Sequence, residues 1–377
     1  MRREDSERLS EPYDRSQPNG RATLAADVGF PLPRVAQLFR TVFGDLDDVA
    51  LGIGWWSPHP GTARRILISD QLVCCLYDLD TNVVEAAIHQ LEARGCAAEF
   101  SRRFVDAVRV HPGGHTVTVP NPRSPAEAIT ERSVAMHVVG AVRALASALD
   151  CFAGATIGVM ALPASILRAD YKVVRTLLAR CEAGGGPAEQ RTAATRLREV
   201  VARAGPGGWD DWVLGYRNML VHRGRRLQLS KLVRTGIELL DPRGPVIVPH
   251  EPVPVMPSDP ERSDVEVFRD ASGKGFLLTE NAWDTLSGAM KSVHYVLEEG
   301  SDVLRRLWEW RRNNPAVLLQ PREQWRTLAS QASVFPGYSP NSLPFDPTEF
   351  RANPEFGRRL AAAALTDATR SRWPTFD

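Results

Sequence analysis

The chain has 377 residues, a formal net charge of +1, 24% charged residues and 43% hydrophobic residues. This composition is typical of a globular protein with room for two domains. A net charge near zero excludes a strongly basic nucleic-acid-binding protein but allows a local basic patch. The first residues are polar and of mixed charge, unlike a signal peptide, and no apolar run approaches the ~18 residues of a membrane span. We therefore expect a cytoplasmic protein that does not bind membranes.

Cysteine and histidine usage gives no sign of a metal site. The five cysteines are odd in number and form no Cys-x-x-Cys motif, which argues against a disulfide framework and a zinc ribbon. His111 and His115 flank a predicted turn, but a metal site needs a third ligand and the sequence offers none nearby. We expect no metal and no cofactor.

The first 120 residues predict a disordered segment and a small domain. Residues 1–25 are polar and contain Pro, Ser and Asn, so we expect them to be disordered. Residues 26–120 predict a small α+β domain whose role the sequence does not indicate. Its expected elements, in order, are a helix over 35–49, a strand over 65–77, an amphipathic helix over 83–94 and a hairpin over 108–120.

Residues 121–313 predict an antiparallel helical bundle. Ser124-Pro125-Ala126-Glu127 is a capping box with proline in the first turn, and it opens a helix that runs to about Met160. Apolar residues at spacings of three and four form one stripe on this helix: Val134, Val138, Val142, Leu145, Leu149 and Phe152. Further helices are expected over 164–183, 188–204, 209–223 and 279–312.

Two segments differ from this helical pattern. Residues 226–278 contain short alternating runs divided by Gly and Pro, which predict a β-rich insertion. Residues 314–377 are expected to form a Pro-rich tail with one short helix near 356–365. The predicted fold class is therefore mainly α: an antiparallel helical bundle with a β-rich insertion and a small mixed α/β N-terminal domain.

The helix predicted over 209–223 is apolar on two faces. At 100° per residue, one face carries Trp212, Tyr216 and Met219, while Leu214 and Val221 lie roughly opposite. A helix of this kind is buried on both sides. We expect the first face to contact the bundle and the second face to need a partner.

Three polar residues of this helix are candidates for catalysis. Arg217 and Asn218 flank the second apolar face, and His222 follows Asn218 by one turn. Arg217 and His222 are about 140° apart on one helix, so they diverge. If two copies met across a two-fold axis, the arginines and histidines of both chains would converge on one cleft. We expect such a composite site in a homodimer.

The chemistry expected of this site is metal-independent cleavage of RNA. Neutral His222 can accept the proton of a 2′-hydroxyl, and the histidine of the second chain can protonate the leaving 5′-oxygen. Arg217 can stabilise the charge on the phosphoryl oxygens, and Asn218 can orient either group. The products would be a 2′,3′-cyclic phosphate and a 5′-hydroxyl. A basic patch follows the helix and is expected to contact the RNA backbone: Arg223, Arg225 and Arg226.

The Arg217-Asn218-x3-His222 pattern, late in a helical bundle, resembles the motif of the HEPN superfamily. The segment around Leu149-Asp150 is also similar to the first bundle helix of bacterial members. The resemblance covers about residues 125–312. It implies a bundle of four to five helices, a homodimer with the motif at its interface, and ribonuclease activity, often that of a toxin or antiphage effector. A regulator encoded in the same operon is a further partner that it allows, although Gly224 replaces the tyrosine that one subgroup needs for modification.

The motif is short, and other interpretations stay open. A second match, Arg132 to His137, has only a serine after the arginine and lies early in a long helix, so we treat it as accidental. Asp150 and Tyr216 are candidates for lining the site, although we favour an ion pair between Asp150 and an arginine. Arg217 and His222 can also be an exposed helix end. The bundle can instead be a catalytically silent module that dimerises or binds nucleotide or protein. A third alternative is a ligand sensor, in which the N-terminal domain regulates the bundle.

Overall fold

The computed structural model describes residues 24–47, 50, 52–56, 62–107, 109–110, 117–118, 124–168, 170–184, 186–222, 228–229, 236–241, 244–248, 254–257, 260 and 279–317. This part of the chain is mainly helical. Its helices are α2 (Leu24–Asp27), α3 (Pro33–Phe43), α4 (Thr62–Ala107), α5 (Pro125–Met160), α6 (Tyr171–Ala183), α7 (Ala188–Arg203), α8 (Trp209–His222) and α10 (Ala282–Asn313). The helices predicted for the bundle are present, although α6 begins seven residues after its predicted start and follows a short 3-10 helix over Ile166–Arg168. The helix predicted over 35–49 ends at Phe43, and Leu46–Asp47 form a strand instead.

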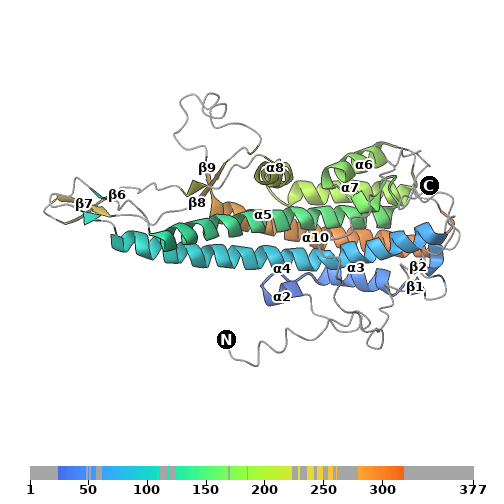
Figure 1. The fold of residues 1–377 in the computed structure, drawn as a ribbon. Coiled ribbons are helices and arrows are strands. Elements are labelled where there is room, and N and C mark those ends of the chain that lie inside the picture. Colours follow the sequence, from blue (N-terminus) through green and yellow to red (C-terminus); the bar gives the residue numbers. More distant parts are fainter. Residues whose placement is uncertain are drawn as a thin grey trace, which may run out of the picture.

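Two long antiparallel helices, α4 and α5, form the spine of the molecule (Figure 1). Asn82 of α4 contacts Cys151 of α5, whereas His89 contacts His137, so residue numbers rise on one helix as they fall on the other. The third long helix, α10, runs along this pair. In Figure 1, α2 and α3 lie below α4, and α6, α7 and α8 lie above α5.

The strand predicted over 65–77 is wrong, because these residues belong to the 46-residue helix α4. Leu72, Leu76, Leu79 and Val83 are all buried, at the spacings of three and four that one helix face requires. The segment is rich in Ile, Leu and Val and lacks a clear polar face, which suggested a strand. Packing against neighbouring helices decides its structure over this local preference.

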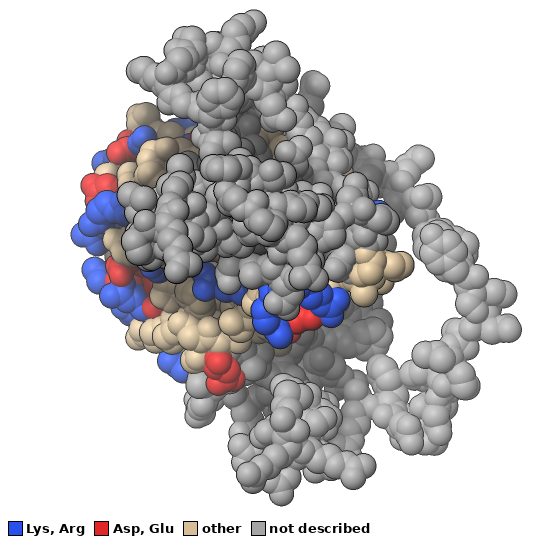
Figure 2. Space-filling view, turned by 90° about the vertical axis from the view of Figure 1, so that its left-hand side faces the viewer, with Lys and Arg blue, Asp and Glu red and all other residues tan. Residues whose placement is uncertain are grey.

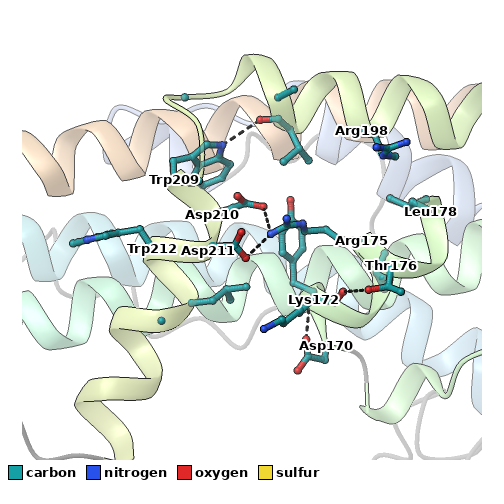
Figure 3. A pocket seen from close by; sticks show the side chains of 18 of the residues that line it. Asp170, Lys172, Arg175, Thr176, Leu178, Arg198, Trp209, Asp210, Asp211 and Trp212 are labelled. Atoms are coloured by element: carbon teal, nitrogen blue, oxygen red, sulfur yellow. Dashed lines mark hydrogen bonds and ion pairs between the residues drawn. The ribbon is translucent and has the colours of Figure 1, made fainter. Parts of the chain in front are cut away.

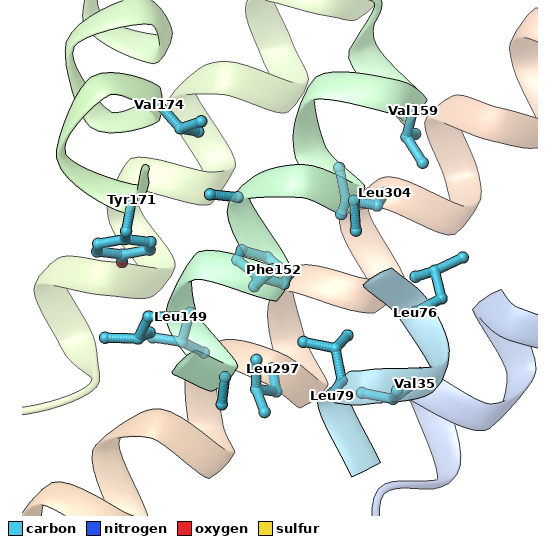
Figure 4. Close-up of a cluster of buried hydrophobic side chains, with 14 of the residues drawn as sticks. Val35, Leu76, Leu79, Leu149, Phe152, Val159, Tyr171, Val174, Leu297 and Leu304 are labelled. Carbon is cyan, nitrogen blue, oxygen red and sulfur yellow. The ribbon is translucent and has the colours of Figure 1, made fainter. Parts of the chain in front are cut away.

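One buried cluster joins the first and the last of the described helices. Val35 of α3 and Leu76 and Leu79 of α4 lie in the same cluster as Phe152 of α5 and Leu304 of α10 (Figure 4). The described part of the predicted N-terminal domain therefore shares the core of the bundle. The apolar stripe predicted on α5 is buried along its whole length.

A buried arginine of α10 caps the C-terminal end of α5. Arg311 of α10 is 2% exposed and donates hydrogen bonds to the carbonyl oxygens of Gly158 (3.2 Å) and Val159 (2.6 Å) in the last turn of α5. Its guanidinium lies 5.2 Å from the ring centre of Trp55, within cation–π distance. These contacts satisfy carbonyl groups that a helix end leaves without partners.

The strands are short and antiparallel. β3 (Arg109–Val110) pairs with β4 (Val117–Thr118), which confirms the predicted hairpin. Strands also occur in the predicted insertion, where β6 (Gly236–Asp241) pairs with β7 (Gly244–Val248). There, β8 (Pro254–Pro257) pairs with β5 (Gln228–Leu229) and with β9 (Thr279–Asn281), which directly follows the insertion. The remaining pair is β1 (Leu46–Asp47) with β2 (Gly52–Ile53).

Among the described helices, α5 contains a segment, Ala128–Met160, whose length and composition would allow it to cross a membrane. Of its most apolar window, 67% is buried inside the bundle, and a core helix passes the same test. The prediction of a disordered segment over 1–25 is wrong for its last two residues, which begin α2, with Ala25 buried; residues 1–23 fall outside the described residues, as do the helix predicted in the tail, His111 and His115.

Candidate functional site

A groove of about 1060 Å³ lies between α6, α7 and α8. Figure 3 shows that its labelled charged side chains come from the N-terminal part of α6, from the first turn of α8 and, for Arg198, from α7. Arg217 and Asn218, two of the residues predicted for catalysis, are among those that line it. The volume is at the upper end of the range for small-ligand sites.

The first turn of α6 forms one wall of the groove. The Asp170 carboxylate caps the helix by accepting hydrogen bonds from the backbone N–H of Lys172 (2.7 Å) and Val173 (3.3 Å). This is the usual role of aspartate at an N-cap. Tyr171 is 2% exposed, and burial raises the pKa of its phenol. Its hydroxyl has no hydrogen-bond partner among the described residues.

The first turn of α8 forms the opposite wall. Gly208 precedes it with φ +80°, a conformation that favours glycine. Asp210 and Asp211 follow, and Arg175 of α6 lies between them, with Nη1 2.8 Å from Asp210 Oδ2 and 2.7 Å from Asp211 Oδ1. Asp210 is 4% exposed, and burial raises its pKa despite the nearby guanidinium. Arg175 therefore links α6 to the first turn of α8 through two ion pairs.

Arg217 lies two turns further along α8. Its Nη1 donates to Asp150 Oδ2 of α5 at 3.2 Å, while Asp150 Oδ1 accepts the backbone N–H of Tyr171 at 3.1 Å. Burial raises the pKa of Asp150, and the contacts with Arg217 and Tyr171 oppose that shift. The ion pair that we favoured for Asp150 is present, and its partner is the candidate catalytic arginine.

The remaining candidate residues are placed differently. Asn218 is exposed at the groove. His222 is the last residue of α8, and its side chain lies outside the described part of the structure, as do Arg223, Arg225 and Arg226. The structure therefore pairs Arg217 with Asp150 and places Arg217 and Asn218 on the lining of the groove.

Tyr216 does not line the groove, contrary to one of our expectations. Its side chain is 0% exposed, and its ring stacks on Trp212 with centres 5.1 Å apart. Tyr216 belongs to a second buried cluster with Val134 and Val138 of α5. The face of α8 predicted to contact the bundle does so, and this orientation turns Tyr216 away from the groove. On the other face, Leu214 is 7% exposed and packs in the main buried cluster of its own chain, so the prediction that this face needs a partner is wrong for Leu214. Val221 is 50% exposed.

The groove carries nearly balanced charge. Its lining includes four basic residues and three acidic residues: Lys172, Arg175, Arg198, Arg217, Asp170, Asp210 and Asp211. In the end-on view of Figure 2, basic and acidic side chains likewise lie close together on the described surface. Arg198 pairs with Glu182, so part of the positive charge is already compensated. The described groove is therefore not a strongly basic channel.

Sequence reasoning missed the contact between α6 and α8. Asp210 and Asp211 were visible as first-turn carboxylates, but Arg175 lies 35 residues before Asp210 and no motif links them. No group of three His, Cys, Asp or Glu side chains that could hold a metal ion occurs within the described ranges. Comparison of the chain with protein-family models, with curated proteins and with solved structures finds no match in any of the three.

Proposed function

We propose that this chain is a metal-independent endoribonuclease of HEPN type that acts as a homodimer. One observation carries the proposal: Arg217 and Asn218, adjacent on α8, line a groove large enough for a nucleotide, and His222 follows one turn later. An imidazole can transfer the protons and an arginine and an amide can stabilise and orient the phosphoryl group in cleavage through a 2′,3′-cyclic phosphate.

Arg217 is the group that binds the scissile phosphate. Asp150 engages only Nη1 of its guanidinium, and within the described structure no hydrogen bond uses Nη2. The carboxylate therefore holds the planar group in a fixed orientation and leaves donor capacity for a phosphoryl oxygen. Positioning a donor before the reaction is what makes transition-state stabilisation effective.

The imidazole comes from His222, and we propose that a second chain completes the site. Arg217 and His222 diverge on one helix, and Val221, half exposed beside them, gives α8 an apolar residue for contact with another copy. Asn218, exposed at the groove, orients the sugar or the imidazole. RNA is the substrate, and Arg223, Arg225 and Arg226 extend the contact with its backbone.

The test is RNA cleavage in EDTA by the full chain. Arg217→Ala and His222→Ala are each expected to lower the rate about 100-fold or more. Arg203→Ala is the matched control, because this arginine is exposed on α7 and does not line the groove. Retained cleavage in both site variants, with folding intact by circular dichroism, removes these residues from the mechanism.

A mixture of the two inactive variants tests whether the site is shared. In a mixed dimer, one composite site has its arginine from one chain and one histidine from the other, so cleavage recovers in part, since the second histidine is still missing. A site built within one chain is damaged in both subunits and recovers nothing. The products, identified by their cyclic phosphate end, separate this reaction from contaminating nucleases.

The balanced charge of the groove favours a second candidate, a catalytically silent bundle that binds a nucleotide or another small ligand. Four basic and three acidic residues attract a long polyanion weakly. For this candidate, EDTA-resistant cleavage is absent, and a nucleotide added alone raises the melting temperature of the wild type but not of Arg217→Ala.

A further inference from the structure

We infer that the joint outer face of α4 and α5 is a surface that binds a second copy of this chain. Six residues define this face: Glu85, Ile88 and Glu92 on α4, and Arg132, Met136 and Arg143 on α5. Ile88 is 47% exposed and Met136 is 59% exposed, although both lie midway along helices whose other sides are buried. The inference goes beyond the proposed nuclease activity and does not depend on it.

The three residues of α4 point away from the rest of the bundle. Gln90 of α4 donates to Ser287 of α10 at 2.9 Å, so the side of α4 that carries Gln90 faces α10. At 100° per residue, Ile88, Glu92 and Glu85 lie about 160–220° from Gln90. They therefore occupy the side of α4 opposite α10, next to the seam with α5.

The residues of α5 flank the same seam. His137 faces α4, because its Nδ1 lies 3.0 Å from His89 Nδ1. Arg132, Met136 and Arg143 lie about 100–140° from His137 in one direction, whereas the buried residue Val138 lies about 100° in the other. The three side chains therefore share the solvent side of the seam with Glu85, Ile88 and Glu92.

Charge on this face is divided between the two helices. Its carboxylates, Glu85 and Glu92, are on α4, and its guanidinium groups, Arg132 and Arg143, are on α5. The contact between His89 and His137 sets the register of the antiparallel pair. In this register Glu85 lies level with Arg143, and Glu92 with Arg132, to within about two residues or ~3 Å.

Such a face is complementary to itself about one particular axis. A two-fold axis parallel to the helices places α4 of each copy over α5 of the other. Glu85 then lies opposite Arg143 of the second copy, Glu92 opposite Arg132, and Ile88 opposite Met136. An axis across the helices would instead bring Arg132 near Arg143 and Glu85 near Glu92. Like charges at an interface are costly, so the parallel axis is selected.

This contact is distinct from the pairing of α8 that the nuclease proposal uses. The helices that line the groove, α6, α7 and α8, lie beyond α5, on the side away from α4 (Figure 1). A two-fold axis along the seam therefore places the two grooves at opposite edges of the pair. Loss of this contact is measured as a change in mass, and loss of the groove's activity as a change in RNA cleavage. Either proposal can therefore fail while the other holds.

The test is a charge exchange in the full chain, followed by light scattering. One variant carries Glu85→Arg and Glu92→Arg, and the other carries Arg132→Glu and Arg143→Glu. Each variant alone has like charges on both helices of the face, so we expect half the mass of the wild type. An equimolar mixture restores opposite charges at all four contacts and is expected to restore the wild-type mass.

Glu189→Arg with Glu199→Arg is the control, since it makes the same charge change on exposed positions of α7 and is expected to keep the wild-type mass. A second variant, Met136→Lys, checks the apolar part of the face and is expected to halve the mass while the separated chains stay folded by circular dichroism, because the side chain is exposed. The inference is overturned if the wild type is a monomer, if either charge variant keeps the wild-type mass, or if the mixture does not regain it.

Discussion

Arg217 of α8 and Asp150 of α5 lie 3.2 Å apart, Nη1 to Oδ2, although 67 residues separate them in the chain. Asp150 also accepts the backbone N–H of Tyr171. One carboxylate thus joins three helices at the edge of the groove. Its effect on stability and its effect on the candidate catalytic arginine can be measured separately.

A double-mutant cycle measures the coupling between these two residues. Asp150→Asn keeps an oxygen for the Tyr171 N–H but leaves the half-buried guanidinium without its counter-charge. Arg217→Gln leaves the half-buried carboxylate of Asp150 without its counter-charge. We expect the double variant to cost less than the sum of the two single variants, with a coupling of about 1 kcal/mol. Urea denaturation gives the three free energies, and additivity within error would show that the pair is not coupled.

Gly300 lies where α10 crosses α5, and its replacement by alanine should be destabilising. An added Cβ would overlap the ring of Phe152, which is buried in the core. We expect Gly300→Ala to lower the free energy of unfolding by about 2 kcal/mol, as overpacking does. Gly288 is the control on the same helix, because its Cβ would meet no heavy atom within 4 Å. Gly288→Ala should raise stability by about 0.5–1 kcal/mol; a loss of stability at Gly288 would contradict this account.

Glu298 of α10 accepts hydrogen bonds from the backbone N–H of Arg34 (3.2 Å) and Val35 (3.3 Å) in the first turn of α3. Burial raises the pKa of this carboxyl above its ordinary value, and these two hydrogen bonds oppose the shift. The folded state therefore binds a proton more tightly than the unfolded state, and stability falls as the pH rises through this interval.

The comparison with Glu298→Gln isolates this effect, because glutamine keeps an acceptor oxygen and cannot ionise. Below roughly pH 4.3, the ordinary glutamate pKa, the two proteins should differ little in their pH dependence. As the pH rises through the folded-state pKa, the wild type should lose stability relative to the variant. Melting temperatures across this range provide the measurement. The prediction is refuted if the melting temperature of the wild type rises relative to that of the variant as the pH increases.

Arg311 contributes to stability through the two carbonyl groups that it satisfies at the end of α5. Arg311→Met fills similar space but leaves both oxygens without this donor, so we expect a loss of about 3 kcal/mol. Arg306 is the control, because its guanidinium is 60% exposed and pairs with Asp302 on the surface of the same helix. Arg306→Met should change the free energy of unfolding by less than about 1 kcal/mol. Equal losses in thermal denaturation would mean that burial of Arg311 is not the cause.

The sequence predicted the helices of the bundle well because their ends and faces carry local signals. Pro125 in the first turn and the stripe from Val134 to Phe152 define α5, and Gly208 immediately precedes α8. The error over 65–77 has the opposite origin. This segment is apolar on most sides because several helices surround it, and no local pattern distinguishes that from a buried strand.

The candidate site was only partly predictable for a similar reason. The motif on α8 identified Arg217 and Asn218, and the ion pair of Asp150 was expected. The bridge from Arg175 to Asp210 and Asp211 depends on how α6 packs against α8, which spacing along the chain does not determine. The orientation of Tyr216 was set by stacking on Trp212, another tertiary contact.

The unbroken helix α4 also has a mechanical consequence. With 46 residues it is about 69 Å long. The β3–β4 hairpin follows its C-terminal end, and α3 packs against its N-terminal half. A tilt of about 5° at the base would sweep the hairpin through about 6 Å. Because Asn82 and His89 contact α5 and Gln90 contacts α10, such a tilt would have to carry both of these helices with it, and the displacement would be largest at the hairpin.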